Sequence, residues 1–278
     1  MSKQKWLLRL KLLSAAMVAY ALARTFFFSS GSKLLSSGEG RKITFLCMRH
    51  GQAEHNIGSR DSNIRDPSLT KLGFRQAKEA GGKLRQFVLP NVDHSNDGSG
   101  GPVDLIICSP MRRTIQTLLT AFPPEFIRNS GGLLKLPEVI LLPHLQELHD
   151  TPCDTGVALE ELRSQFTAEQ WSVFNTSLVP DEWYNKGPAA DDDVRHQARA
   201  AQLQGKLIEI VNAHPTAKRV LVVGHSGNFR HWLFGGSRER KPRNCEVIRC
   251  ELTIDATAAT RRPVCSAKAV VVPDTITL

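Results

Sequence analysis

Short apolar runs that end in a polar turn recur along this chain, and they constrain its fold more than any other feature. Each run is rich in strand-forming side chains. They cover residues 43–48, 103–108, 138–142, 219–223, 246–254 and 267–272, the last at a sheet edge. Helical patterns separate them at residues 70–88, 111–121, 193–213 and 228–234. Strands that alternate with helices predict an α/β fold with a mostly parallel central sheet and helices on both faces.

The first of these runs leads directly into Arg49, His50 and Gly51. Gly51 lets the backbone leave the strand by a turn that a residue with a Cβ would resist. In open α/β sheets, ligands bind at the carboxyl ends of the strands. An imidazole beside a fixed guanidinium suits attack on a phosphate, because the arginine holds the anion while the histidine supplies a lone pair.

Two later runs end in the same kind of chemistry. The second leads through Ser109 and Pro110 to the pair Arg112 and Arg113, and the fourth leads into Gly224-His225-Ser226-Gly227. A single strand-end histidine is more often structural. Two such histidines, together with arginines that also follow strand ends, form a specific constellation for a phosphoryl group.

These segments resemble the histidine phosphatase superfamily, in its phosphoglycerate-mutase-like branch. Four separate segments match in order across about residues 42–254, and D-P-S-L-T-x-x-G-x-x-Q-A, which starts at Asp66, fits the same pattern. The chain departs from the pattern at Thr114, where alanine is usual, and at Ser226, where glycine or alanine is common. The segment around Pro152-Cys153-Asp154 is most similar to divergent phosphatase-like members.

The resemblance implies roles for four phosphate-binding side chains and one nucleophile. Neutral His50 attacks phosphorus and forms a phosphohistidine, while Arg49, Arg113 and His225 donate to the phosphoryl oxygens and Asn56 helps to hold them. Arg112 is the second choice for the arginine of its pair.

The proton donor is less closely specified. Leu145-Gln146-Glu147 follows the third run and resembles the L-x-E segment that carries the acid of the superfamily. We therefore expect Glu147 to protonate the leaving oxygen and then to activate water. Asp150 and Glu138 are the alternatives.

The expected function is that of a metal-independent phosphomonoester hydrolase, of the histidine acid phosphatase type, that acts on a small anionic phosphorylated substrate. The resemblance implies no metal and no cofactor, because guanidinium groups supply the positive charge. A phosphoglycerate mutase shares the same core and is the alternative, and a non-catalytic phosphate-binding scaffold ranks third. A cysteine phosphatase is excluded, because the arginine that must stand six residues after the cysteine falls on Thr114 when counted from Cys108.

Charge and hydropathy divide the chain into two parts. Residues 1–38 carry six basic side chains and no acid, so only +3 of the net charge of +9 belongs to the remainder. The basic balance therefore gives no reason to expect a nucleic-acid surface. Residues 12–23 are uncharged and follow a basic start. We expect residues 1–38 to be a targeting leader or membrane anchor, with the secretory pathway favoured over mitochondria, and residues 42–278 to be the histidine phosphatase domain.

Overall fold

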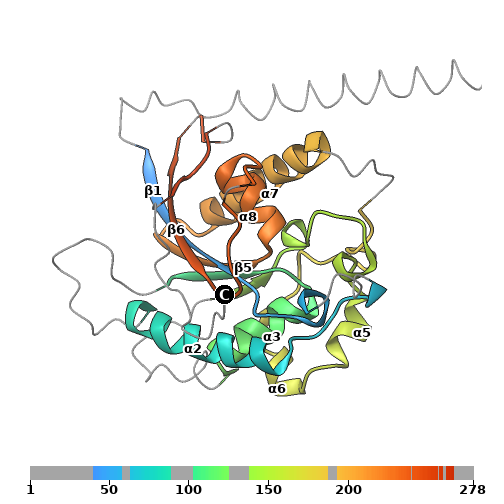
Figure 1. Cartoon of the computed structure of the whole chain (residues 1–278). Coiled ribbons are helices and arrows are strands. Elements are labelled where there is room, and N and C mark those ends of the chain that lie inside the picture. The colour runs from blue at the N-terminus through green and yellow to red at the C-terminus, as the bar shows by residue number, and fades with distance from the viewer. Residues whose placement is uncertain are drawn as a thin grey trace, which may run out of the picture. The chain divides into compact units, whose positions relative to one another are not determined.

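The computed structural model of the protein describes residues 40–57, 63–88, 103–124, 138–186, 193–238, 240–255, 257–258 and 261–265 (Figure 1). The expected leader and the strand expected at residues 267–272 lie outside the described residues. Within the described part of the chain, no helix has the length and apolar character needed to cross a membrane.

The described strands form one sheet in the order β4-β3-β2-β5-β1-β6-β7. Their bounds are β1 Arg41–Arg49, β2 Leu105–Cys108, β3 Glu138–Leu141, β4 Phe174–Asn175, β5 Arg219–Gly224, β6 Val247–Ile254 and β7 Val264–Cys265. The first five in this order run parallel, whereas β6 is antiparallel to β1 and β7 is antiparallel to β6. This arrangement confirms the mostly parallel sheet.

Helices cover both faces of this sheet, as predicted (Figure 1). Alternate residues of β1 point to opposite faces: Leu46 packs with α2 (Lys71–Val88) and α3 (Arg112–Ala121), whereas Phe45 packs with α7 (Asp193–Ala213) and α8 (Ser226–Phe234). Both side chains are buried, since a central strand between two helical layers has no exposed face.

The helix termini follow from local chemistry. Thr70 directly precedes α2 and accepts a hydrogen bond from the Gly73 N–H at 3.0 Å, so its hydroxyl caps the start of this helix. Helix α8 begins at Ser226, two residues earlier than expected, because His225 keeps an extended backbone and the helix starts directly after it.

The segment between Glu147 and α7 contains η4 (Pro152–Asp154), α5 (Leu159–Arg163) and α6 (Ala168–Trp171). Leu162 and Trp183 of this segment are buried in the same apolar cluster as α2 and α3. Leu162 and Trp183 therefore lie on the face of the sheet that α2 and α3 cover.

A disulfide joins Cys250 to Cys265 where β6 pairs with β7. The remaining four cysteines are buried thiols: Cys47, Cys108, Cys153 and Cys245.

The adjacent glycines of α2 have different surroundings. A Cβ at Gly81 would lie 2.4 Å from the Ala121 carbonyl oxygen of α3, whereas a Cβ at Gly82 would meet nothing within 4 Å. Gly81 is therefore required for the close approach of two helices. Gly82 only raises the conformational entropy of the unfolded chain.

We predict opposite effects of alanine at these two positions. Gly82→Ala should raise the free energy of unfolding by about 0.5–1 kcal/mol, because alanine favours the helix and meets no neighbour. Gly81→Ala should lower it by about 1–3 kcal/mol, because the methyl group forces α2 away from α3. Urea unfolding at pH 7 measures both, and a stabilising Gly81→Ala would contradict the described helix contact.

Candidate active site

Backbone pairing places His50 and His225 together at the carboxyl ends of neighbouring strands. Strand β5 lies between β1 and β2. The His50 N–H donates to the Gly224 carbonyl and the Ser109 N–H donates to the Val223 carbonyl, both at 3.0 Å. The carboxyl ends of the three strands are thereby level, and the imidazole rings of His50 and His225 lie 5.2 Å apart between centroids.

A cavity of about 290 Å³ opens at this edge. Four of the six predicted site residues line it: Arg49, His50, Asn56 and Glu147. The other two, Arg113 and His225, are completely buried beside it. The structure therefore brings all six to one place, with two of them beneath the lining.

His50 is held in the form that a nucleophile needs. Its Nδ1 lies 2.7 Å from the Gly51 carbonyl oxygen, and a carbonyl can only accept, so Nδ1 carries the hydrogen and Nε2 keeps its lone pair. Burial, followed by the nearby charges of Arg113 and Arg49, holds the pKa of His50 well below its ordinary value. The imidazole is thus neutral at physiological pH.

His225 is oriented by a neighbour on β2. Its Nε2 lies 2.9 Å from the Ser109 hydroxyl, while its buried Nδ1 has no hydrogen-bond partner. Burial and the Arg113 charge also keep the pKa of His225 well below its ordinary value.

Two buried guanidiniums supply the positive charge. Arg49 donates to the Pro242 carbonyl at 2.9 Å, and burial lowers its pKa to about 10, so it stays charged at pH 7. Arg113 donates to the Cys153 carbonyl at 2.7 Å and to the Asp154 carboxylate at 3.3 Å.

Arg112, the second choice, faces elsewhere. Its guanidinium contacts the Ser68 hydroxyl at 3.5 Å, and its backbone N–H donates to Asp66. The geometry thus favours Arg113 over Arg112.

Glu147 is the only one of the three carboxylates considered that lines the cavity. Glu138 starts β3 at the opposite edge of the sheet and bonds His214, and Asp150 pairs with Arg195 at 2.6 Å. The Glu147 carboxylate accepts from the backbone N–H groups of Leu148 at 2.9 Å and Gly227 at 3.1 Å. A Cβ at residue 227 would lie 2.1 Å from Glu147 Oε1, so glycine is needed for this contact.

The protonation of Glu147 reflects opposing effects. Burial raises its pKa, but the two N–H donors and the Arg113 charge outweigh burial and bring the pKa below its ordinary value. In this structure Glu147 is therefore an ionised carboxylate at neutral pH.

Sequence reasoning missed several side chains that line the cavity. These are His55, His149, Asp154, Arg230 and Lys241. Arg230 could have been found, because it lies four residues after Ser226 on α8 and so shares its helix face. His55 gave no signal in the sequence, since only the short η1 turn (Glu54–Asn56) folds its ring to 5.8 Å from that of His50.

Among the described residues, one group could offer a metal three ligand atoms within 4.8 Å of one another: Asp193, His196 and His231. The guanidinium of Arg230 contacts Nε2 of His231 at 2.9 Å. The fixed positive charge of Arg230 beside this group opposes a second cation, so we assign no metal to it.

Cys108 cannot act as a thiolate nucleophile here. Its side chain is fully buried, and burial raises the pKa of the thiol. This agrees with the sequence argument against a cysteine phosphatase.

The chain is similar to known phosphatases and phosphoglycerate-mutase-like proteins. The family model described as histidine phosphatase superfamily (branch 1) matches residues 45–257. A "Probable phosphatase" of Schizosaccharomyces pombe is 29% identical over 147 residues, which are 52% of this chain and 59% of that protein. A "Phosphoglycerate mutase-like protein" of Arabidopsis thaliana is 26% identical over 76% of this chain and 79% of its own length. The crystal structure of phosphoglycerate mutase from Bacillus anthracis aligns with a TM-score of 0.47 at 15% identity, over 84% of this chain and 94% of that one.

We predict that the partly buried His55 makes the fold sensitive to acid. Burial lowers the pKa of His55 to about 3, so His55 stays neutral in the folded protein while the unfolded chain binds a proton below about pH 6.5. Its contribution to stability is present above pH 6.5 and is lost as the pH falls toward 3.

The variant His55→Gln removes this contribution. Between pH 7 and pH 5, its free energy of unfolding should fall by about 1 kcal/mol less than that of the wild type, after allowance for partial exposure of the ring. Urea unfolding at the two pH values measures the difference. An equal fall in the free energy of unfolding of the two proteins would show that the fold does not hold His55 neutral.

Proposed function

The chain belongs to branch 1 of the histidine phosphatase superfamily, and on that premise we propose that it is a metal-independent phosphomonoester hydrolase that works through a phosphohistidine. The observation that carries the proposal is the state of His50. It is neutral, its Nδ1–H is fixed by the Gly51 carbonyl, and it lines a cavity beside Arg49.

In the first step Nε2 of His50 attacks phosphorus. The N–P bond forms as the bond from phosphorus to the leaving oxygen breaks, and Glu147 gives that oxygen a proton. Arg49, Arg113 and His225 donate to the other phosphoryl oxygens and offset the charge of the transition state. Asn56 lines the same cavity and assists in holding the group.

In the second step Glu147, now a carboxylate, takes a proton from water. The resulting oxygen attacks phosphorus, the N–P bond breaks, and inorganic phosphate leaves. His50 and Glu147 return to their starting states, so the cycle balances without an added reactant.

The substrate we propose carries a second anionic group. Arg230 from α8 and Lys241 line the cavity in addition to Arg49. Neither of these two side chains has a role in the chemical steps above. Two further cations at the mouth of a phosphate site favour a phosphorylated acid or a bisphosphate over a neutral alkyl phosphate.

A mutase is the alternative, because it shares the phosphohistidine. A mutase must keep water away from the phosphohistidine until the substrate has reoriented in the site. The segment around Pro152-Cys153-Asp154, which resembles divergent phosphatase-like members of the superfamily, favours hydrolysis. Product analysis with 3-phosphoglycerate separates the two, since a hydrolase releases inorganic phosphate and a mutase forms an isomer.

We predict that His50→Ala abolishes turnover of p-nitrophenyl phosphate, because the variant lacks the nitrogen that forms the N–P bond. The wild type should keep its activity in EDTA and should trap an acid-labile, alkali-stable phosphoryl group during turnover. The control is His214→Ala, which changes a histidine bonded to Glu138 at the opposite edge of the sheet. Full activity of His50→Ala, or loss of wild-type activity in EDTA, would contradict the proposal.

We predict that Arg230→Ala raises KM for 3-phosphoglycerate about tenfold and changes KM for p-nitrophenyl phosphate by less than about twofold. The physical reason is the loss of one charge-assisted contact to the second anion, worth about 1.4 kcal/mol. The control is Lys42→Ala, which removes the same charge from an exposed position at the amino end of β1. An equal change for both substrates would show that Arg230 does not recognise a second anion.

A further inference from the structure

The turn that leads into β6 lies against the residues at the end of β1. The Pro242 carbonyl accepts from the Arg49 guanidinium at 2.9 Å, and the Cys245 N–H donates to the Arg49 carbonyl at 3.0 Å. Asn244, between these two in sequence, is half-buried and is not among the described residues that line the cavity. Any effect of Asn244 on the chemistry must therefore pass through the residues that it contacts.

The side-chain amide of Asn244 contacts two residues of the site. Its Nδ2 donates to the His50 carbonyl at 3.0 Å and lies 3.4 Å from Oδ1 of Asn56. An amide nitrogen carries two hydrogens, so it can serve both acceptors. Because a carbonyl can only accept, the contact with His50 also determines which end of the Asn244 amide faces these residues.

The amide of Asn56 is oriented by a backbone group in the same way. The Ala53 N–H can only donate, so the atom of Asn56 that lies 3.1 Å from it is Oδ1. Every hydrogen bond of the Asn56 side chain within the described part of the chain is made by this oxygen, with Ala53 and Asn244 as the donors. Since Asn56 lines the cavity, its Nδ2–H groups are left for a ligand there.

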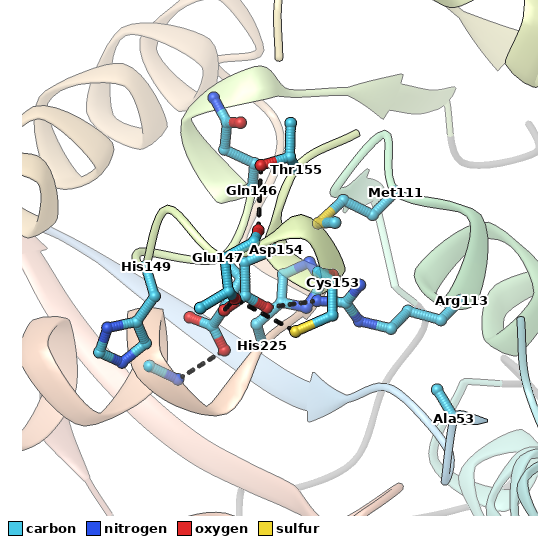
Figure 2. Close-up of polar contacts among 12 residues, drawn as sticks. Ala53, Met111, Arg113, Gln146, Glu147, His149, Cys153, Asp154, Thr155 and His225 are labelled. Atoms are coloured by element: carbon cyan, nitrogen blue, oxygen red, sulfur yellow. Dashed lines mark hydrogen bonds and ion pairs between the residues drawn. The ribbon is translucent and has the colours of Figure 1, made fainter. Parts of the chain in front are cut away.

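Other phosphate-binding side chains are likewise held by distant segments. Figure 2 shows the Arg113 guanidinium reaching the Asp154 carboxylate, which accepts from it at 3.3 Å. Arg49 is held by the Pro242 carbonyl. A donor that is already aimed before the ligand arrives loses less entropy on binding and stabilises the transition state more. The same requirement applies to the amide of Asn56.

We propose that Asn244 is a positioning residue that holds Oδ1 of Asn56, so that the Nδ2–H groups of Asn56 donate to the phosphoryl group. The proposal rests on the proposed function, in which Asn56 assists in holding that group. No covalent bond changes at either asparagine. Both act on the phosphoryl oxygens, which every phosphomonoester shares, and neither acts on the leaving group.

The turn has supports that do not involve the Asn244 side chain. The buried Glu246 carboxylate accepts from the Arg240 guanidinium at 2.9 Å and from the Arg243 N–H at 2.6 Å. The Cys245 N–H is bonded to backbone carbonyls at the end of β1. Asn244→Ala therefore removes the side-chain contacts of Asn244 and leaves these supports in place.

A double-mutant cycle on p-nitrophenyl phosphate tests the proposal. Asn56→Ala should lower kcat/KM by about 10- to 100-fold, because a hydrogen bond to a charged group is lost. Asn244→Ala should lower it by about 3- to 10-fold, because the Asn56 amide is then held by one donor. In the Asn56→Ala background, Asn244→Ala should change kcat/KM by less than about twofold, since the side chain that it orients is gone.

The matched control is Asn175→Ala. Asn175 is also half-buried, and its side-chain amide donates to Glu138 at the start of β3. This variant should keep kcat/KM within about twofold of the wild type. If Asn244→Ala does not fold, Asn244→Asp takes its place, because it has nearly the same shape and its ionised carboxylate cannot donate to Asn56. The cycle with Asn244→Asp should still show a coupling of at least about threefold.

The comparison of two substrates separates positioning from a merely structural role. Because Asn56 acts on the phosphoryl group alone, Asn244→Ala should lower kcat/KM for 3-phosphoglycerate and for p-nitrophenyl phosphate by the same factor, within about twofold. A displaced turn would also move Lys241, which belongs to the turn and lines the cavity. The loss would then be larger for 3-phosphoglycerate, which carries the second anion.

Three results would overturn the proposal: an unchanged kcat/KM in Asn244→Ala, the same loss from Asn244→Ala with and without Asn56, or a larger loss with 3-phosphoglycerate. The same cycle measured as Kd for inorganic phosphate keeps the proposal distinct from the proposed function. A wild type that neither turns over substrate nor traps a phosphoryl group would refute the hydrolase. Coupling between Asn56 and Asn244 in phosphate binding would still support the positioning role, and its absence would refute it.

Discussion

The pairing of β5 between β1 and β2 is the constraint on which the rest of the site depends. Two backbone hydrogen bonds, from His50 to Gly224 and from Ser109 to Val223, fix where the three strands end relative to one another. A shift of one residue in either pairing would turn His50 or His225 to the other face of the sheet. Register, set by an apolar core on both faces, therefore determines the distance between two imidazoles.

Burial at the carboxyl ends of these strands affects the histidines and the arginines differently. It removes the proton from the histidines, while the guanidiniums stay charged, since burial lowers the pKa of Arg49 only to about 10. The result is a neutral nucleophile beside permanent cations. A lysine in place of Arg49 would lose its charge more readily under the same desolvation.

The parts of the site that the sequence predicted are those that local pattern controls. A strand run that ends in a glycine turn places Arg49 and His50 without reference to any other segment, and His225 follows the same logic. Glu147 needed the family resemblance, since it lies after a 3-10 turn (η3, Pro143–Leu145) that has no strand pattern. The preference for Arg113 over Arg112 rests on the surroundings of the two side chains, which local sequence pattern does not determine.

The parts that sequence reasoning missed depend on contacts between distant segments. Asp154 was visible within a motif, but its partner Arg113 lies 41 residues away, and nothing local indicates that a carboxylate there is buried. The surroundings of Gly81 and Gly82 differ in the same way, because only one of them meets α3.

The charge balance of the cavity links these observations. Arg49 and Arg113 stand against Glu147 and Asp154, so the charges of these four groups cancel when both carboxyls are ionised. An incoming phosphoryl dianion must then compete with Asp154 for Arg113, which weakens binding of any anion that cannot also engage Arg49 and His50. In the proposed hydrolysis, the Asp154 carboxylate therefore lowers the affinity of Arg113 for every phosphate, including the inorganic phosphate that must leave.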